Sequence, residues 1–343
     1  MLLGSMPTVT PPQWTTLATG AHPQTHGITA FYRQGGDLDK VALNFDSTNC
    51  KAEQLWNVTA EAGKKTIVWH WPGSAWPPSS DSENLHVVDG TSPGGVNMSS
   101  AQIDGEYIVM AAETVEVIEY RSGAMTDAKV PCVVTGLGEE KKAKKGGGLN
   151  DLMQRKSDEG FPLYIVNPNK DGQGGSHMIP ADIAFSSIKP AEKWANEVPA
   201  DAKEFLIITF YGKVMRPALN LKNEAGVYDK VAIYKDKATV EPLTILENDV
   251  FTGVYDTVPS ANKEEKVYRN MRLLKIAEDG SYVRIWASRG MSCVDDSVWF
   301  PKHLFKEVTD LFGPPQPTSQ MSGNDKDLIL KCNNPQWTMA AEW

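Results

Sequence analysis

The chain has 343 residues, of which 41% are hydrophobic and 22% are charged, and its formal net charge is −9. This composition is that of a folded, soluble protein, and its acidic balance argues against a nucleic-acid backbone as a partner. No apolar run reaches the length of a membrane span, and the opening "MLLGSMPTV" is too short for the apolar part of a signal peptide. We therefore expect no membrane span and place the chain in the cytoplasm by default.

Two further features of the composition exclude function classes. The one dense basic run, "EEKKAKKGGG" at residues 139–148, begins with acids and ends in glycines, so we interpret it as a solvated loop. The cysteines lie far apart and form no C-x-x-C pair, which argues against a zinc knuckle or a redox motif and is compatible with a reducing compartment. They are Cys50, Cys132, Cys293 and Cys332.

The first predicted element is a short helix that begins at Thr10. Thr10 as N-cap, Pro11 at the first helical position and Gln13 at the third match a capping box, and Gly20 supplies a stop. One reading is that Thr10 only caps the helix. The other is that its hydroxyl lies beside free backbone N–H groups, where a phosphate oxygen would bind. The apolar face is expected at Trp14, Leu17 and Ala18.

A tight loop is expected after this helix, because Pro23, His26 and Gly27 closely follow Gly20 and are not needed to cap the helix. Helical spacing then returns over residues 52–60, and Gly63 ends that helix. The β-branched and aromatic run "KTIVWHW" predicts a strand, with His70 inside it as a packed or hydrogen-bonded histidine. Helix followed by strand is the order of an α/β sheet.

These motifs together resemble a known family. The text "PTVTPPQWTTLATGAHPQTHGITAF" (residues 7–31) is similar to the nucleophile motif of the alkaline phosphatase superfamily, in its type I phosphodiesterase/nucleotide pyrophosphatase and phosphohydrolase/phosphomutase branch. The segment "AEQLWNVTAEAGKKTIVWHWPGS" (residues 52–74) looks like the helix and strand that follow there. The resemblance implies an α/β fold, here an incomplete alkaline-phosphatase-like α/β/α core.

The resemblance also implies a chemistry. Thr10 aligns with the nucleophile, which forms a phospho-enzyme, and also with one of the metal ligands. Two divalent metal ions, with zinc as the expected metal, would lower the pKa of its hydroxyl and activate water. The expected substrate is a small-molecule phosphate ester. Nucleotide pyrophosphatase members carry an Asn where this chain has Phe31, which puts that narrower specificity in doubt.

Most of the metal ligands that the resemblance requires are missing. None of the six histidines lies in an Asp-His-Gly or Asp-x-x-x-His motif, and too few residues precede Thr10 for a strand that ends in Asp. The final "NNPQWTMAAEW" reads as a helix cut in mid-pattern. We therefore expect that both ends are truncated, that the remaining ligands lie outside this chain, and that the chain does not retain the two metals.

The rest of the chain predicts a different architecture. Residues 100–300 contain many β-type runs separated by turn signals, such as "EFLIITFYG" and "YVRIWASRG", and read as a large β-rich insertion. It would either cover the active site and select the substrate or serve a structural or dimer-forming role. Residues 301–343 return to a helix that begins at His303 and stops at Gly313. The predicted domains are thus 1–99, 100–300 and 301–343.

Two functions remain open at this point. The first is a metal-dependent phosphoester hydrolase, of phosphodiesterase or phosphatase type, with Thr10 as its nucleophile. The second is a catalytically inactive, truncated member that binds a ligand or a partner. The sequence leaves the leaving group, the choice of mono- or diester and the oligomeric state open.

Overall fold

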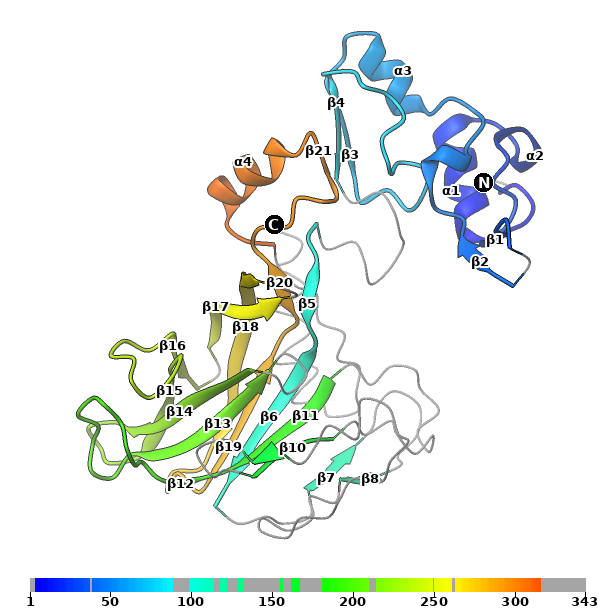
Figure 1. Cartoon of the computed structure of the whole chain (residues 1–343). Coiled ribbons are helices and arrows are strands. Elements are labelled where there is room, and N and C mark those ends of the chain that lie inside the picture. Colours follow the sequence, from blue (N-terminus) through cyan, green and yellow to red (C-terminus); the bar gives the residue numbers. More distant parts are fainter. Residues whose placement is uncertain are drawn as a thin grey trace. The chain divides into compact units, whose positions relative to one another are not determined.

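The structure is a computed structural model, and it describes residues 4–37, 39–88, 99–113, 118–121, 129–132, 155–156, 162–166, 181–209, 214–248, 250–260 and 263–315. The predicted basic loop at 139–148 and the predicted helix at the end of the chain lie outside these residues. The described part is a mixed α/β protein with several sheets and few helices (Figure 1). It forms two compact units: unit 1 comprises Met1–Ala101 and Val294–Pro315, and unit 2 comprises Gln102–Cys293.

Unit 1 consists of short elements. A hairpin pairs β1 with β2, and a three-stranded sheet has the order β21-β4-β3, in which β3 and β4 run parallel and β21 is antiparallel. Its elements are α1 (Thr10–Thr19), α2 (Pro23–His26), β1 (Tyr32–Gln34), β2 (Val41–Leu43), the 3₁₀ helix η1 (Ser47–Asn49), α3 (Leu55–Glu61), β3 (Thr66–Trp69), β4 (Leu85–Val88), β21 (Trp299–Phe300) and α4 (His303–Phe312).

The predicted helix-then-strand order is confirmed in unit 1. α3 ends before Gly63, whose φ of 77° suits glycine, and β3 follows. Trp56 and Ala60 on α3 pack with Val68, Leu85 and Val87 on the sheet in one small apolar core. The parallel β3–β4 pair with its crossover is the part of an α/β sheet that the structure contains here. The larger α/β/α core stays a prediction.

Unit 2 is built from strands. A nine-stranded sheet has the order β5-β20-β18-β19-β6-β11-β10-β9 with β17 also on β18, and a five-stranded sheet has the order β12-β13-β14-β15-β16. The strands are β5 (Gln102–Asp104), β6 (Glu106–Ala112), β7 (Ile118–Arg121), β8 (Lys129–Cys132), β9 (Arg155–Lys156), β10 (Pro162–Val166), β11 (Ala181–Ser187), β12 (Lys189–Pro190), β13 (Lys203–Thr209), β14 (Val214–Lys222), β15 (Tyr228–Ile233), β16 (Thr244–Glu247), β17 (Phe251–Ser260), β18 (Lys263–Ile276), β19 (Tyr282–Ala287) and β20 (Gly290–Ser292).

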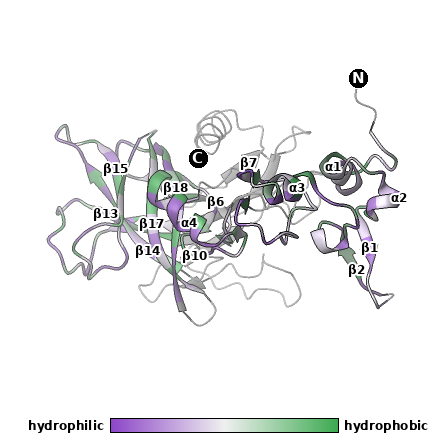
Figure 2. Ribbon diagram, turned by 90° about the horizontal axis from the view of Figure 1, so that it is seen from above, coloured by the Kyte–Doolittle hydropathy of each residue, from purple (hydrophilic) through white to green (hydrophobic). Residues whose placement is uncertain are grey.

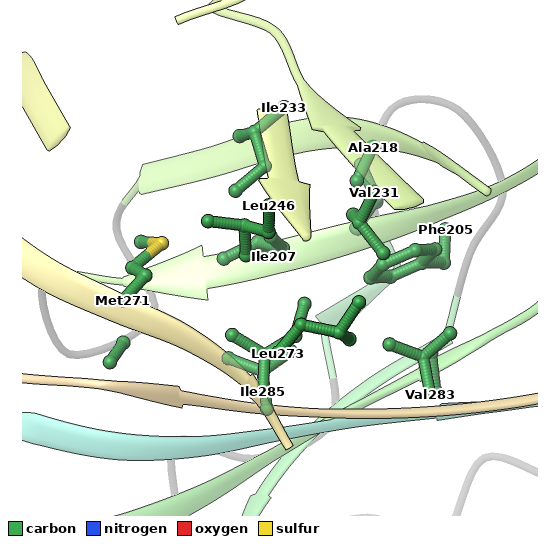
Figure 3. Close-up of a cluster of buried hydrophobic side chains, with 14 of the residues drawn as sticks. Phe205, Ile207, Ala218, Val231, Ile233, Leu246, Met271, Leu273, Val283 and Ile285 are labelled. Atoms are coloured by element: carbon green, nitrogen blue, oxygen red, sulfur yellow. The ribbon is translucent and has the colours of Figure 1, made fainter. Parts of the chain in front are cut away.

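The two large sheets of unit 2 pack face to face over one apolar core. Phe205 and Ile207 on β13 and Val231 on β15 meet Leu273 on β18 and Ile285 on β19 (Figure 3). Arg272 beside Leu273 and Arg284 beside Ile285 are less buried, as the other face of a strand allows, whereas Leu206 on β13 and Ala232 on β15 are buried too. Hydrophobic residues gather on the strands of this unit and hydrophilic ones on its connecting loops (Figure 2). The β-type patterning predicted for this part of the chain is therefore found as strands.

Two long strands of unit 2 were not among the predicted β-type runs. β14 contains Pro217, which has no backbone N–H and normally argues against a central strand. In β18 every residue from Val267 to Met271 is buried, so no alternation of buried and exposed residues marks this stretch as a strand. The described helices include none that is long and apolar enough to cross a membrane. Whether unit 2 is an insertion that covers an active site, and where the predicted domains end, stay predictions.

Candidate active site

Thr10 is the first residue of α1 and is half-buried. Val9 before it is extended, with φ −117° and ψ 159°, so the chain turns from an extended segment into the helix at Thr10. The predicted cap is wrong: Val9 is the N-cap, and no side chain caps the helix. Pro12 has no amide to donate, and the Gln13 amide donates instead to the Val9 carbonyl at 3.2 Å. The Thr10 hydroxyl is therefore not engaged as a cap.

The amide groups beside Thr10 are fewer than the sequence reading expected. A helix N-terminus usually presents several unbonded N–H groups. Here Pro11 and Pro12 carry none, and the amide of Gln13 is bonded to Val9. Among the first three helical residues only Thr10 itself has an N–H. An anion at this end would meet the helix dipole, the Thr10 amide and the Thr10 hydroxyl, but not a cradle of amides.

The segment before Thr10 is fastened to α1 by Gln13. The amide of Ser5 donates to Gln13 Oε1 at 3.1 Å, and Gln13 Nε2 donates to the carbonyl of Pro7 at 3.0 Å and to that of Ser5. Gln13 lies one turn after Thr10 on the same helix. Its side chain thus fixes residues 5–7 against the helix that they precede. The sequence reading had assigned Gln13 to a capping box.

His26 is fully buried at the end of α2 and belongs to a chain of hydrogen bonds. The amide of Ile28 donates to its Nδ1 at 3.1 Å, so Nδ1 carries no proton and Nε2 carries it. Nε2 lies 3.1 Å from Thr16 Oγ1, which lies 3.0 Å from Ser5 Oγ. Burial lowers the pKa of His26, and the carbonyl of Pro12 opposes this only partly. His26 is neutral at pH 7, and both of its ring nitrogens have protein partners.

His70 lies outside the strand in which the sequence placed it. β3 ends at Trp69, and His70 follows with a left-handed φ of 52°. Its Nε2 lies 2.7 Å from Ser99 Oγ, and the carbonyl of Ser99 accepts from Trp299 Nε1 at 2.5 Å. Burial lowers the pKa of His70 to about 4, so it too is neutral at pH 7. This is the hydrogen-bonded role predicted for it, and it links the end of β3 to β21.

Phe31 and the "WPGS" text meet in the same part of unit 1. The ring of Phe31 packs edge-on against Phe45 at 5.2 Å, and Asn44 donates to the carbonyl of Ala30 at 3.1 Å. Gly73 has a φ of 82°, and a Cβ there would lie 2.9 Å from Phe45. Glycine is therefore required at this position by both backbone and space.

A buried polar network behind this text was missed by the sequence reading. Gln54 Nε2 donates to the carbonyl of Ser74 at 3.2 Å, and Asn57 Nδ2 donates to Gln54 Oε1 at 2.9 Å and to Ser79 Oγ at 2.8 Å. Gln54, Asn57 and Ser74 are each at most 3% exposed. Spacing gave no signal for them, because a polar residue on a helix is normally interpreted as solvent-facing.

The residues described do not fit a metal site around Thr10. A catalytic zinc ion takes about three protein ligands from His, Asp, Glu or Cys. Among the described residues no three such side chains lie close enough together to hold one ion. His26 uses both nitrogens within the protein, and His70 is paired with Ser99. A site formed by Thr10 with these two histidines and a carboxylate is not present in this part of the chain.

Comparison with known proteins finds one family model that matches the first part of the chain. Residues 2–131 match the model of the family described as type I phosphodiesterase / nucleotide pyrophosphatase, which lies in the alkaline phosphatase superfamily. The match includes Thr10, the His26 loop and the "WPGS" text, and so confirms the resemblance predicted from residues 7–31 and 52–74. No curated protein and no solved structure matches the chain significantly.

Proposed function

We propose that the chain is a phosphoester hydrolase of the phosphodiesterase type, with Thr10 as its nucleophile and a small-molecule phosphate mono- or diester as its substrate. The observation that carries this proposal is the position of Thr10. It stands at the turn from an extended segment into α1, inside the segment that matches a phosphodiesterase family, with a hydroxyl not spent on capping. A hydroxyl at a helix N-terminus lies where the dipole favours a negatively charged phosphoryl group.

The chemistry has two steps. Thr10 Oγ1 attacks phosphorus, so that the Oγ1–P bond forms while the ester P–O bond breaks. The hydroxyl proton passes to solvent, and the leaving alkoxide takes a proton from solvent. Water then attacks the phosphothreonine, which breaks the Oγ1–P bond, restores the hydroxyl and releases the phosphate product. The sum is one ester and one water converted into one alcohol and one phosphate.

The family is generally metal-dependent, but the described residues do not fit the two ions that the resemblance implies. The chain's own residues carry both steps, and we propose that the chain does not retain the two ions. The residues present act by placing Thr10 and by presenting the positive end of α1. Titration of metal-free protein with zinc tests this point, and a stoichiometric tight site would contradict it.

The lack of a metal-ligand cluster among the described residues favours a second function. A member of this family without a metal site would bind a phosphate ester or a partner and would not turn it over. The absence of a ligand cluster among the described residues supports this alternative. It predicts binding without hydrolysis, which separates it from the first proposal.

The deciding experiment compares the full chain with Thr10→Ala and Thr10→Ser, using p-nitrophenyl phosphate and bis(p-nitrophenyl) phosphate with zinc, manganese or magnesium. Thr10→Ala should lose on the order of 10³-fold or more of the turnover, because the covalent route is gone. Thr10→Ser keeps a hydroxyl and should retain part of it. Intact-protein mass after an acid quench should show one phosphoryl group on wild type and on Thr10→Ser, and none on Thr10→Ala. Equal turnover by Thr10→Ala would overturn the role of Thr10, and no turnover by any form would support the binding function.

A further inference from the structure

We propose that His26 is a positioning residue for Thr10: it holds the segment that leads into the nucleophile through a relay of hydrogen bonds that runs by way of Thr16 to Ser5. This inference rests on the proposed function, because it assigns a role within the same site. It also gives a role to the histidine of the "PQTHGI" text, which is not needed to cap the helix α1.

The relay has a defined donor and acceptor at each of its hydrogen bonds. The Ile28 amide can only donate, so His26 Nδ1 accepts and Nε2 must be the protonated nitrogen. Nε2 is therefore the donor, and it faces two acceptors, Thr16 Oγ1 at 3.1 Å and the carbonyl of Pro12. The Thr16 hydroxyl proton is then directed to Ser5 Oγ at 3.0 Å. One backbone amide thus sets the tautomer of the histidine, and the tautomer sets the orientation of two hydroxyl groups.

The relay fixes Ser5 against the helix α1. Ser5 is bonded at three of its groups: its hydroxyl to Thr16, and its amide and carbonyl to Gln13. Thr16 and Gln13 both lie on α1, the helix that begins with Thr10. The segment 5–9 is therefore fixed to α1 at both ends: Ser5 is hydrogen-bonded to the helix, and residue 9 leads into its first residue, Thr10. Ser5 is the anchor of this loop, and its position limits where Thr10 Oγ1 can lie.

His26 cannot be replaced by an apolar residue of similar size without loss. It is 0% exposed and Ile28 is 1% exposed, so the Ile28 amide would have no water to bind in place of the histidine. Gly27, which follows with a φ of 82°, turns the chain so that the Ile28 amide faces the ring of His26. The histidine thus joins two segments by two opposite hydrogen-bonding functions, an acceptor and a donor.

The test uses two variants that each keep one of these functions. In His26→Asn the side-chain oxygen replaces Nδ1 and can still accept from Ile28, but it does not reach Thr16. In His26→Gln the side-chain amide replaces Nε2 and can still donate to Thr16, but the acceptor for Ile28 is lost. Amide hydrogen exchange in the full chain should be roughly 10-fold faster at Ser5 in His26→Asn and at Ile28 in His26→Gln, the effect of losing about one hydrogen bond.

Two further measurements make the result independent of how well these variants fold. The ¹⁵N signals of the wild-type ring should show a protonated Nε2 and a bare Nδ1. Thr16→Val should speed exchange at Ser5 and leave Ile28 protected, whereas Thr16→Ser, which keeps the hydroxyl, should change neither. Equal effects of His26→Asn and His26→Gln on both amides, or a protonated Nδ1, would overturn the relay.

The outcome is distinguishable from that of the proposed function. Exchange rates and ring signals report the relay whether or not the chain hydrolyses esters. If turnover is measurable, His26→Asn should lower kcat more than His26→Gln while KM changes little, because the nucleophile and not the substrate is displaced. The predicted exchange pattern without turnover in any form would retain the relay and remove the hydrolase. Turnover with equal kcat in both variants would retain the hydrolase and remove the positioning role.

Discussion

Unit 1 and unit 2 are held together in different ways. Unit 2 buries a continuous apolar core between two large sheets, from Val109 on β6 to Leu246 on β16. Unit 1 has a much smaller apolar core, and both units bury polar side chains, such as His26 and Gln54 in unit 1 and Arg269 and Asn270 in unit 2. Apolar burial is non-directional, whereas each hydrogen bond fixes a direction and an atom. The difference between the units is therefore one of apolar burial: unit 2 has the larger core, and unit 1, which carries Thr10, depends relatively more on its directional contacts.

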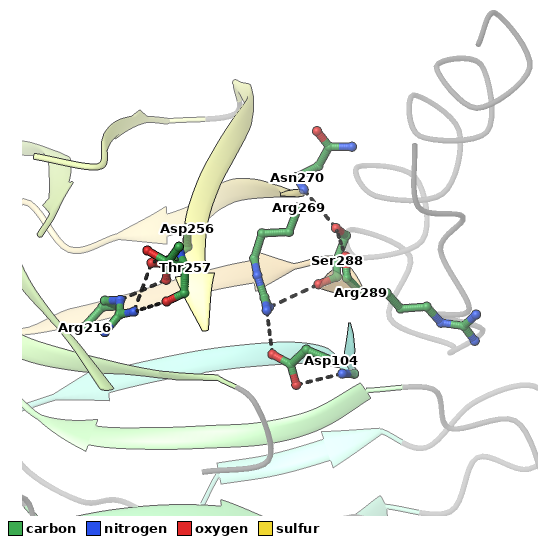
Figure 4. Close-up of polar contacts among 9 residues, drawn as sticks. Asp104, Arg216, Asp256, Thr257, Arg269, Asn270, Ser288 and Arg289 are labelled. Carbon is green, nitrogen blue, oxygen red and sulfur yellow. Dashed lines mark hydrogen bonds and ion pairs between the residues drawn. The ribbon is translucent and has the colours of Figure 1, made fainter. Parts of the chain in front are cut away.

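The largest expected loss of stability comes from breaking a buried ion pair in unit 2. Arg269 Nη2 lies 2.5 Å from Asp104 Oδ2, and both side chains are at most 4% exposed (Figure 4). Asp104→Asn should lower the free energy of unfolding of unit 2 by about 3–5 kcal/mol, because it leaves an uncompensated buried guanidinium. Urea unfolding followed by hydrogen exchange of peptides from each unit is the measurement.

The matched control is Asp256→Asn. Arg216 binds Asp256 through two hydrogen bonds of 2.8 and 2.9 Å, but both side chains reach solvent, at 13% and 12% exposure (Figure 4). Its loss should cost clearly less than the loss of Asp104. Equal costs would mean that burial does not set the value of these pairs.

The apolar core of unit 2 can be tested with two isoleucines on neighbouring strands. Ile233 on β15 is 1% exposed, and Ile245 on β16 is 46% exposed. Ile233→Ala should destabilise unit 2 by about 2–5 kcal/mol, since it removes buried groups and leaves a cavity. Ile245→Ala should change stability by only about 0.5 kcal/mol. Thermal unfolding of both variants checks this, and similar costs would contradict the sandwich core.

Between about pH 7 and pH 5, acid should lower the stability of unit 1 and leave that of unit 2 nearly unchanged. Burial lowers the pKa of His26, and it lowers the pKa of His70 to about 4 from an ordinary 6.5. Below pH 6.5 these histidines bind protons in the unfolded chain but stay neutral in the folded unit. The free energy of unfolding of unit 1 is therefore constant above this pH and falls as the pH decreases toward 4. The slope is at most about 1.4 kcal/mol per pH unit for each histidine.

The described residues of unit 2 include no histidine, and His177, which falls within the range of this unit, lies outside them; the slope of unit 2 is the internal reference for this titration. Urea unfolding of each unit between about pH 7 and pH 5, read by hydrogen exchange, gives the two slopes. His70→Gln should reduce the slope of unit 1. A unit 1 whose stability does not change over this range would show that neither histidine is buried in its neutral form.

The smallest expected effect concerns glycines of unit 1. Gly63 and Gly73 both have a positive φ, of 77° and 82°, but a Cβ meets nothing within 4 Å at Gly63 and lies 2.9 Å from Phe45 at Gly73. Gly63→Ala should cost about 1–2 kcal/mol of backbone strain. Gly73→Ala should cost about 1 kcal/mol more through overpacking. Thermal unfolding of the two variants measures the difference, and equal costs would mean that Phe45 moves aside freely.

Much of the local structure of unit 1 follows from its sequence. Gly20 and Gly27 end α1 and α2 with φ values of 67° and 82°, and Pro11 stands in the first turn of α1 as predicted. These are local preferences, because a left-handed residue without a Cβ or a proline ring acts on its own few neighbours. The predicted capping box was wrong for a local reason as well. Pro12 has no amide N–H, and the amide of Gln13 donates to the carbonyl of Val9.

The strands of unit 2 divide in the same way. Runs such as "EFLIITFYG" and "YVRIWASRG" are found as β13 and β19, because β-branched and aromatic residues mark them. β18 was missed because it is buried on both faces, and β14 because Pro217 stands within it. Which faces of a strand become buried depends on the sheets that pack against it, and no window of sequence contains that information.

What the sequence by itself determined is the class of the first part of the chain, the residue proposed as nucleophile and the sites where helices stop, all of which depend on motifs a few residues long. Only the tertiary structure decided that His26 is a buried neutral link to Ser5 and that Asp104 meets Arg269, 165 residues away. It also left Thr10 with fewer amides than its helix suggested. Such pairings depend on which side chains lose water together, and burial is a property of the packed fold and not of the chain.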